Sequence, residues 1–218
     1  MNKISYVGVD DNTLDLFESQ YIIPNGVSYN SYIIHDEKTT IMDTVDKRVS
    51  EEWIKNVEED LAGIKPTYLV VSHLEPDHSA NIERITKKYP EIKIILSVKA
   101  ASMLPQFIKT DLTDKLIIVK ENDEMDLGHH KLKFLMAPMV HWPEVMFTYE
   151  QTENVLFSAD AFGKFGSLTT NEDWDCEARR YYFNIVRKIW YAGTSNIKKS
   201  CRTRNKENLS IAWPRFRR

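Results

Sequence analysis

The sequence predicts an α/β or α+β protein in which two packed sheets are flanked by helices. Strand-like apolar segments recur from residue 28 to residue 160, helical patterns separate several of them, and many of the strands are almost continuously apolar. Such strands are typical of sheets that are covered on both faces. Strands that come first and are later mixed with helices indicate two packed sheets rather than a strict alternation of strand and helix.

The expected strands are rich in Val, Ile, Tyr and Phe. The clearest helical pattern, at residues 49–61, places Val49, Trp53, Ile54 and Val57 on one stripe with Leu61, behind an acidic first turn. Two more helical patterns follow, at 79–89 and 175–186. The strands are expected at 28–34, 39–45, 67–72, 92–97, 115–119, 131–138, 144–149 and 154–160.

Composition indicates an ordinary globular protein. The 218 residues are enough for one well-packed domain or slightly more. No apolar run approaches the roughly 20 residues that cross a bilayer, and the N-terminus has no signal-peptide pattern. Two cysteines, Cys176 and Cys201, suit a reducing compartment. We therefore expect a cytoplasmic protein with no membrane partner. The sequence also contains no Gly-rich phosphate loop.

The most informative segment is SHLEPDH, residues 72–78, which gathers two histidines and two carboxylates directly after an apolar strand. Pro76 indicates a loop that leads into a helix near Ser79 or Ala80. A polar surface loop with incidental histidines is the alternative interpretation. Metal ligation explains better why imidazoles and carboxylates gather at a strand end. The candidate ligands are His73, Glu75, Asp77 and His78.

Two further candidates lie at the ends of later strands. His141 comes just beyond the strand expected at 131–138, and Asp160 ends the strand expected at 154–160. Each alone is weak evidence, because a single aspartate at a strand end is more often a turn or cap residue. Together with SHLEPDH they repeat one arrangement, a ligand at the end of a strand. This repetition predicts a two-metal site at one edge of a sheet sandwich.

The motif His-x-Glu-x-Asp-His, with a later His and a later Asp, resembles that of the metallo-β-lactamase superfamily. Zinc hydrolases of that superfamily generally have His where this chain has Glu75, whereas flavodiiron proteins (A-type flavoproteins) have Glu. The segments PNGVSYNSYII, HWPEVMFTY and LFSADAFGKFG also resemble flavodiiron sequences. The resemblance covers residues 1 to about 186. It implies a metallo-β-lactamase-like αββα sandwich that is incomplete at the C-terminus.

The resemblance also implies a ligand set for two iron ions. His73, Glu75 and His141 would hold one iron, Asp77 and His78 would hold the other, and Asp160 would bridge them. The donor chemistry independently favours iron, because the Glu75 carboxylate makes the site harder and more negative than an imidazole would. Zinc has no redox chemistry that such charge would stabilise. The alternative is a zinc-dependent hydrolase, in which a metal-bound hydroxide attacks an ester or amide.

The activity implied by the resemblance is reduction of NO to N2O, of O2 to water, or both. In the family, FMN returns electrons to the iron from a flavodoxin-like domain C-terminal to the diiron domain. We expect no flavodoxin domain in this chain, so FMN would be supplied from elsewhere. A rubredoxin-like or flavin electron donor and a homodimer are expected, and no nucleic-acid partner.

Residues 187–218 differ from the rest of the chain in charge. They carry ten Lys or Arg and one acid, Glu207, whereas residues 1–186 carry 19 basic and 31 acidic residues. A basic arm usually indicates binding to nucleic acid or acidic partners. The family pattern, however, requires one more histidine after Asp160 on the second iron, and none follows His141 here. A chain that folds but holds the second metal poorly is therefore a third interpretation.

We interpret this tail as a frameshift product, natural or introduced during sequencing or cloning. Reading the codons one base later forces a glycine across Trp190 and Tyr191, and another across Trp213 and Pro214. Around these glycines the code permits Gly-Lys-Tyr-Gly and Cys-Pro-Leu-His-Gly-Pro, as in the family, and the second segment contains the missing histidine. The predicted domains are thus a diiron domain at 1–186 and an aberrant basic tail at 187–218.

Other polar residues have simpler interpretations. His129 and His130 are adjacent in an expected turn, where solvent-facing positions are predicted. Asp43 sits at the end of a strand and either orients a ligating histidine or serves as a turn or cap residue. The acidic run at 120–126 is expected to be a solvated loop.

Overall fold

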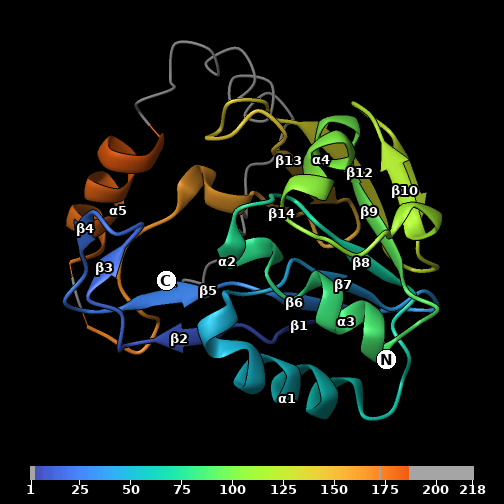
Figure 1. Cartoon of the computed structure of the whole chain (residues 1–218), viewed down its shortest axis with the longest axis horizontal. Coiled ribbons are helices and arrows are strands. Elements are labelled where there is room, and N and C mark those ends of the chain that lie inside the picture. Colours follow the sequence, from blue (N-terminus) through green and yellow to red (C-terminus); the bar gives the residue numbers. More distant parts are fainter. Residues whose placement is uncertain (1–2, 172, 187–218) are drawn as a thin grey trace.

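The computed structural model describes residues 3–171 and 173–186, whose strands form two main sheets (Figure 1). The first sheet is antiparallel from β1 to β7 and parallel from β7 to β10. Its strand order is β1 (Lys3–Tyr6), β6 (Tyr32–His35), β7 (Thr40–Met42), β8 (Tyr68–Val70), β9 (Lys93–Ser97) and β10 (Leu116–Val119). The second sheet is antiparallel, in the order β11 (Glu124–Asp126), β12 (Lys131–Met136), β13 (Met146–Glu150) and β14 (Val155–Phe157).

Two short ribbons and several helices complete the described fold. The ribbons pair β2 (Val9–Asp11) with β5 (Val27–Tyr29), and β3 (Leu16–Phe17) with β4 (Tyr21–Ile22). The helices are α1 (Ser50–Leu61), α2 (Pro76–Ser79), α3 (Ile82–Lys88), α4 (Val98–Met103) and α5 (Trp174–Tyr181), which continues as a π-helical segment at Tyr182–Val186. Short 3-10 turns lie at Lys47–Val49, Leu104–Gln106, Thr113–Lys115 and Ala159–Phe162, the last of which is η4.

Alternation along the strands builds two apolar cores. Successive side chains of a strand point to opposite faces, so each central strand supplies both cores. The core between the two sheets contains Ile34, Met42, Val70 and Ile95 from the first sheet and Leu132, Phe134, Met146 and Phe157 from the second. Their chain neighbours Ile33, Ile41, Leu69 and Ile94 belong to the other core, together with Trp53, Val57, Ile82 and Ile85 of the helices. The predicted two-sheet architecture with flanking helices is confirmed.

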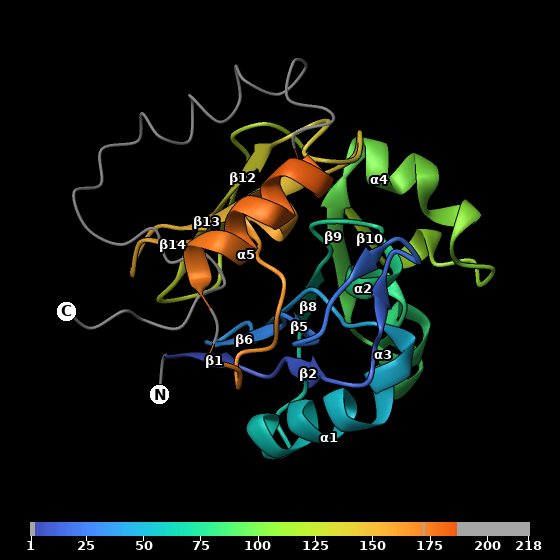
Figure 2. The same ribbon diagram turned by 90° about the vertical axis from the view of Figure 1, so that its left-hand side faces the viewer.

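The helices cover the outer sides of this sandwich. Figures 1 and 2 show α1 along the bottom of the molecule and α5 above it, on the side that faces the viewer in Figure 2. The predicted helix at 49–61 is confirmed as α1, which buries Trp53, Ile54, Val57 and Leu61 and ends at a left-handed Ala62. The α5 helix packs its Tyr181 ring on Phe165, with ring centroids 5.1 Å apart. No helix among the described residues is long and apolar enough to cross a bilayer.

Several local expectations need correction. The strand expected at 28–34 is divided between β5 and β6, which belong to different sheets. The acidic run at 120–126 is not wholly a loop, because Glu124–Asp126 form the edge strand β11. The loop predicted between residue 72 and the next helix contains the one-turn helix α2. The predicted aberrant tail, 187–218, lies outside the described residues.

His130 was wrongly expected to face solvent. Its side chain is fully buried, and its ring Nδ1 lies 2.9 Å from Asp36 Oδ2. The backbone N–H groups of His129 and His130 also donate to the Asp36 carboxylate. The reason is tertiary: the turn before β12 packs on the turn between β6 and β7, which a strand pattern cannot reveal.

The strand ends create a shared edge for polar side chains. Because β7, β8 and β9 are parallel, the residues that follow them emerge at the same edge of the first sheet. The second sheet is joined there by a hydrogen bond from the Met146 N–H to the Ser72 carbonyl, 3.0 Å long. Segments distant in sequence therefore meet at this edge.

Candidate metal centre

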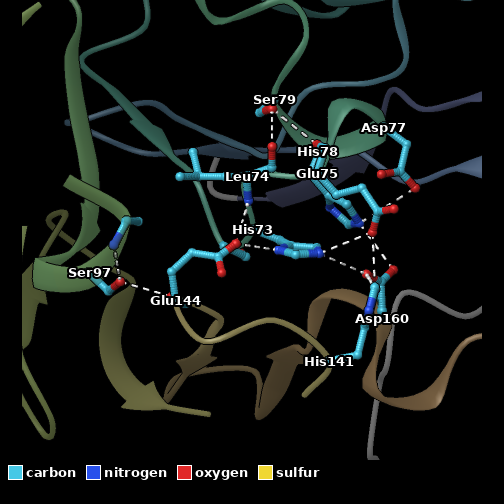
Figure 3. Close-up of polar contacts among 12 residues, drawn as sticks. His73, Leu74, Glu75, Asp77, His78, Ser79, Ser97, His141, Glu144 and Asp160 are labelled. Atoms are coloured by element: carbon cyan, nitrogen blue, oxygen red, sulfur yellow. Dashed lines mark hydrogen bonds and ion pairs between the residues drawn. The ribbon is translucent and has the colours of Figure 1, made fainter. Parts of the chain in front are cut away.

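The six predicted ligands converge at this edge (Figure 3). They come from four segments: the loop after β8, helix α2, the connection between β12 and β13, and η4 after β14. Helix α2 is fixed to the end of β7 because the Thr44 N–H and hydroxyl both donate to the His78 carbonyl, at 2.9 Å each. The ligands are His73, Glu75, Asp77, His78, His141 and Asp160.

The first set of donors comprises His73, Glu75, His141 and Asp160, whose ligand atoms all lie within 4.8 Å of one another. Glu75 Oε2 lies 3.0 Å from His141 Nε2 and 3.2 Å from His73 Nε2. Asp160 Oδ2 lies 3.3 and 3.4 Å from the same two nitrogens. Two imidazole nitrogens and two carboxylates thus surround one position.

The second set comprises Asp77, His78 and Asp160. His78 Nε2 lies 3.1 Å from Asp160 Oδ1 and 3.9 Å from Asp77 Oδ2. Asp160 belongs to both sets and offers a different oxygen to each. A carboxylate placed in this way can bridge two adjacent metal ions.

Glu144 orients His73 from the side opposite the cluster. Its Oε1 lies 2.6 Å from His73 Nδ1 and also accepts the Leu74 N–H at 3.0 Å. The Ser97 hydroxyl donates to the Glu144 carbonyl at 2.8 Å, which ties this segment to the end of β9. Because Nδ1 is engaged with a carboxylate, Nε2 is the nitrogen that His73 offers to a metal. Glu144 is almost fully buried, as is His73.

Asp43 orients His78 in the same manner but more loosely. Its Oδ2 lies 3.3 Å from His78 Nδ1, and its Oδ1 accepts the Ser72 N–H at 2.6 Å. The interpretation of Asp43 as a residue that orients a candidate ligand is confirmed by this contact. Each of these two histidines therefore has a carboxylate behind it and presents Nε2 to the cluster.

Acidic and basic groups of the centre shift one another's pKa values. Burial alone would lower the pKa of His73, yet hydrogen bonds with Glu144 and Glu75 raise it to about 9. Burial would also lower the pKa of His141, but hydrogen bonds with Asp160 and Glu75 raise it to about 10. Burial by itself would raise the pKa of Glu75, but hydrogen bonds with His141 and His73 lower it to about 2. A metal ion must therefore displace imidazole protons when it binds.

The sequence patterns missed two carboxyl groups of this centre. Glu144 lies three residues after His141, but spacing alone gave no reason to pair it with His73. Glu18 lies in the tight turn between β3 and β4 with a φ of 49°. Burial raises the pKa of Glu18 to about 7, and the neighbouring Glu75 adds to the rise. The two-residue strands on either side of Glu18 carry no periodicity that could have predicted its place.

The donor atoms fit metal ions. Among the described residues, Asp77 Oδ1 is buried and has no hydrogen-bond partner, and Asp160 Oδ2 is buried against the imidazole nitrogens of His141 and His73. Buried polar atoms are normally paired, so a buried carboxylate oxygen without a partner, in a cluster of imidazoles and carboxylates, is better explained as a metal ligand. Mixed imidazole and carboxylate donors suit iron, and they also accept zinc.

This combination of a two-sheet sandwich and a histidine–carboxylate cluster at its edge defines a protein of metallo-β-lactamase-like fold. A family model described as "ODP family beta lactamase" matches residues 27–212. The chain belongs to that family.

Named relatives of this chain are flavorubredoxins and flavodiiron proteins. It is 34% identical over 208 residues to the anaerobic nitric oxide reductase flavorubredoxin of Vibrio vulnificus, an alignment that covers 91% of this chain and 42% of that protein. It is 34% identical over 163 residues to the flavo-diiron protein FprA2 of Clostridium acetobutylicum, covering 74% of this chain and 40% of that protein. The resemblance inferred from the sequence is thereby confirmed.

Solved structures agree. The rubredoxin oxygen:oxidoreductase of Desulfovibrio gigas superposes with a TM-score of 0.83 at 26% identity, covering 92% of this chain and 51% of that chain. The flavodiiron protein of Giardia intestinalis gives a TM-score of 0.74 at 25% identity, covering 91% and 49%. The chain thus spans about half of these structures, and about two fifths of the curated relatives.

Proposed function

We propose that this chain is the diiron domain of an oxidoreductase that reduces NO to N2O, O2 to water, or both. The observation that carries the proposal is Asp160, which offers one oxygen to each of two donor sets, beside Glu75 in place of an imidazole. Relatives named as a nitric oxide reductase and as an oxygen oxidoreductase support both substrates.

The side chains divide into ligands and residues that orient them. His73, Glu75 and His141 would hold one iron, Asp77 and His78 would hold the other, and Asp160 would bridge. The bound irons supply the redox chemistry. The chain's own contribution is to present Nε2 of His73 and His78, through the carboxylates of Glu144 and Asp43 that engage each Nδ1.

Electrons would come from outside this domain. Relatives bear the names flavorubredoxin and rubredoxin oxygen:oxidoreductase, which supports an FMN or rubredoxin-like donor. A homodimer and a cytoplasmic location complete the proposal. The described helices include none that could span a bilayer, which is compatible with that location.

The test is metal content and redox activity after anaerobic purification of the full chain. We expect two irons per chain, and consumption of NO or O2 when a chemically reduced flavin or rubredoxin is supplied. Two zinc ions retained when iron is available, together with ester or amide hydrolysis, would instead establish the zinc hydrolase.

We also propose that the domain boundary at residue 186 marks a change of reading frame. The test is to sequence the gene and its transcript around codons 185–188. A one-base slip that restores Gly-Lys-Tyr-Gly is expected. An uninterrupted frame in independent clones would contradict it.

A further inference from the structure

The tetrapeptide HWPE, residues 141–144, lies in the connection between β12 and β13 and contributes twice to the first metal position. His141 is a candidate ligand there, and Glu144 orients the second ligand, His73. Trp142 stands between them in the chain and is partly buried. Its indole ring is neither a candidate ligand nor a charged group, so any effect of Trp142 on the metal position must act through other side chains.

The backbone that carries Trp142 is held on both sides. The Met139 N–H donates to the Trp142 carbonyl at 2.8 Å. Two residues further along the chain, the Glu144 carbonyl accepts the Ser97 hydroxyl at 2.8 Å. The indole ring is therefore carried by a segment whose position is fixed against β9 and against its own turn.

The Trp142 ring packs on both imidazoles of the first donor set. Its centroid lies 5.1 Å from that of His73, and the two ring planes are almost perpendicular, at 88°. The corresponding values for His141 are 6.2 Å and 76°. Both are edge-to-face arrangements at distances that are typical of favourable ring pairs. Phe107, which is 38% exposed, packs on Trp142 from the protein surface at 5.8 Å.

These ring contacts restrain what hydrogen bonds leave free. A hydrogen bond at Nδ1 holds one edge of an imidazole but opposes tilting of the ring plane only weakly. For His73, Glu144 supplies that hydrogen bond and Trp142 supplies the perpendicular ring. For His141, the contacts with described residues that involve a ring nitrogen all use Nε2, and no carboxylate of this part of the chain engages its Nδ1. The orientation of His141 therefore depends more on packing than that of His73 does.

We propose that Trp142 is a positioning residue, which fixes the ring planes of His73 and His141 so that both Nε2 atoms address the first metal position. Ligands bind a metal ion best when packing and hydrogen bonds lock their side chains in the productive orientation. The inference rests on the proposed function to the extent that an ion must bind among these side chains. Trp142 itself touches no metal ion and exchanges no proton or electron.

The experiment titrates the metal-free, full-length chain with Co²⁺ and follows visible absorption and calorimetry. The matched variants are Trp142→Leu, which removes the ring, and Trp142→Phe, which keeps one. We expect Trp142→Leu to weaken the tighter Co²⁺, the one surrounded by four donors, by about tenfold or more and to change its visible bands. Trp142→Phe should bind this ion within about threefold of the unchanged chain. The weaker Co²⁺ should change by less than about twofold in both variants.

A control variant separates positioning from a general loss of packing. Phe107→Leu makes the same change from ring to leucine at a side chain that packs on Trp142 rather than on an imidazole, so it should leave both Co²⁺ affinities nearly unchanged. Denaturant unfolding of each metal-free variant measures its effect on the fold alone. If Trp142→Leu does not fold, Trp142→Met takes its place with the same expectation, because methionine is flexible enough to fill the space without a ring.

The possible results separate this inference from the proposed function. If the variant without a ring binds two Co²⁺ ions with unchanged affinity and bands, Trp142 positions neither histidine, while the two-metal function stands. Equal weakening in Trp142→Phe or in Phe107→Leu would show that the ring contacts are not the cause, and an effect on the weaker ion alone would place the influence of Trp142 in the wrong half. If the unchanged chain binds no Co²⁺, the proposed function fails and the inference fails with it.

Discussion

The two halves of the candidate metal centre differ in how closely the described residues enclose them. In the first half, His73 is fully buried and its Nδ1 is held at 2.6 Å by a buried carboxylate, Glu144. In the second half, the corresponding contact between His78 and Asp43 is 3.3 Å, and an open cavity adjoins it. The first half draws on the loops after β8 and β12, which join both sheets. The second half relies on one short helix and one shared aspartate.

This difference shows that the two positions of a candidate two-metal site can differ in the number of side chains that the described residues provide. Residues 73–160 contain every donor of the first half together with the group that orients His73. Among the described residues the second half has three donors, and a cavity borders it. We therefore expect the two ions to differ in affinity, and the variants below test that expectation.

The largest effect is expected for Asp160→Asn, because Asp160 belongs to both donor sets. An amide retains one oxygen acceptor but loses the charge and the second carboxylate oxygen, so neither ion keeps its bridge. We expect iron content to fall from two per chain to less than one, measured by elemental analysis. Retention of two tightly bound irons would show that Asp160 does not bridge.

The next largest effect is expected for the difference in metal loss between the variants His78→Ala and His141→Ala. Removing His78 leaves two carboxylates at the second position, whereas removing His141 leaves three donors at the first. We expect His78→Ala to lose one ion completely and His141→Ala to weaken one ion by about tenfold or more. Equal losses in the two variants would contradict the unequal halves.

A smaller effect is expected at the residues that orient the histidines. Glu144→Gln removes the charge that engages His73 Nδ1, and such changes typically weaken metal binding by about 10–100-fold. Asp43→Asn is the matched variant in the second half, where the contact is longer, so its effect should be smaller. Metal titration of both proteins measures the difference, and a larger effect of Asp43→Asn would reverse the comparison.

The smallest effect concerns a third histidine–carboxylate pair, Asp36 and His130, which lies outside the centre. Burial by itself would raise the pKa of Asp36. Hydrogen bonds from backbone N–H groups, of which that of His130 has the largest effect, lower this pKa to about 2. The ionised carboxylate therefore stabilises the fold above the ordinary Asp pKa, and this stability is lost as pH falls from about 4 to about 2.

Asp36→Asn should accordingly lower the free energy of unfolding by roughly 2 kcal/mol at pH 7 and by much less near pH 2. Denaturant unfolding at both pH values measures this, with exposed Glu37→Gln as the control. Metal content should stay unchanged. A loss of metal in Asp36→Asn would mean that this pair does more than hold two turns together.

Several parts of this molecule were determined by short-range pattern. The stripe of residues 49–61 is sufficient for α1, because helical periodicity is local. SHLEPDH brings four candidate ligands within six residues, so their proximity needs no tertiary contact. His141 and Asp160 were predicted as ligands because each lies at the end of an expected strand, as the SHLEPDH segment does. The prediction holds because these strand ends lie at the same edge of the sandwich.

Other parts depended on contacts between distant residues. Glu144 meets His73 across 71 positions of the chain, and Asp43 meets His78 across 35, and only the packing of the sheets sets those distances. His130 looked like a turn residue and is instead buried on Asp36, 94 positions away. The sequence alone thus determined which side chains could bind metal. Tertiary structure decided which nitrogen each of these two histidines offers and which half of the candidate centre borders the cavity, since burial and orientation arise only when the sheets and loops have packed.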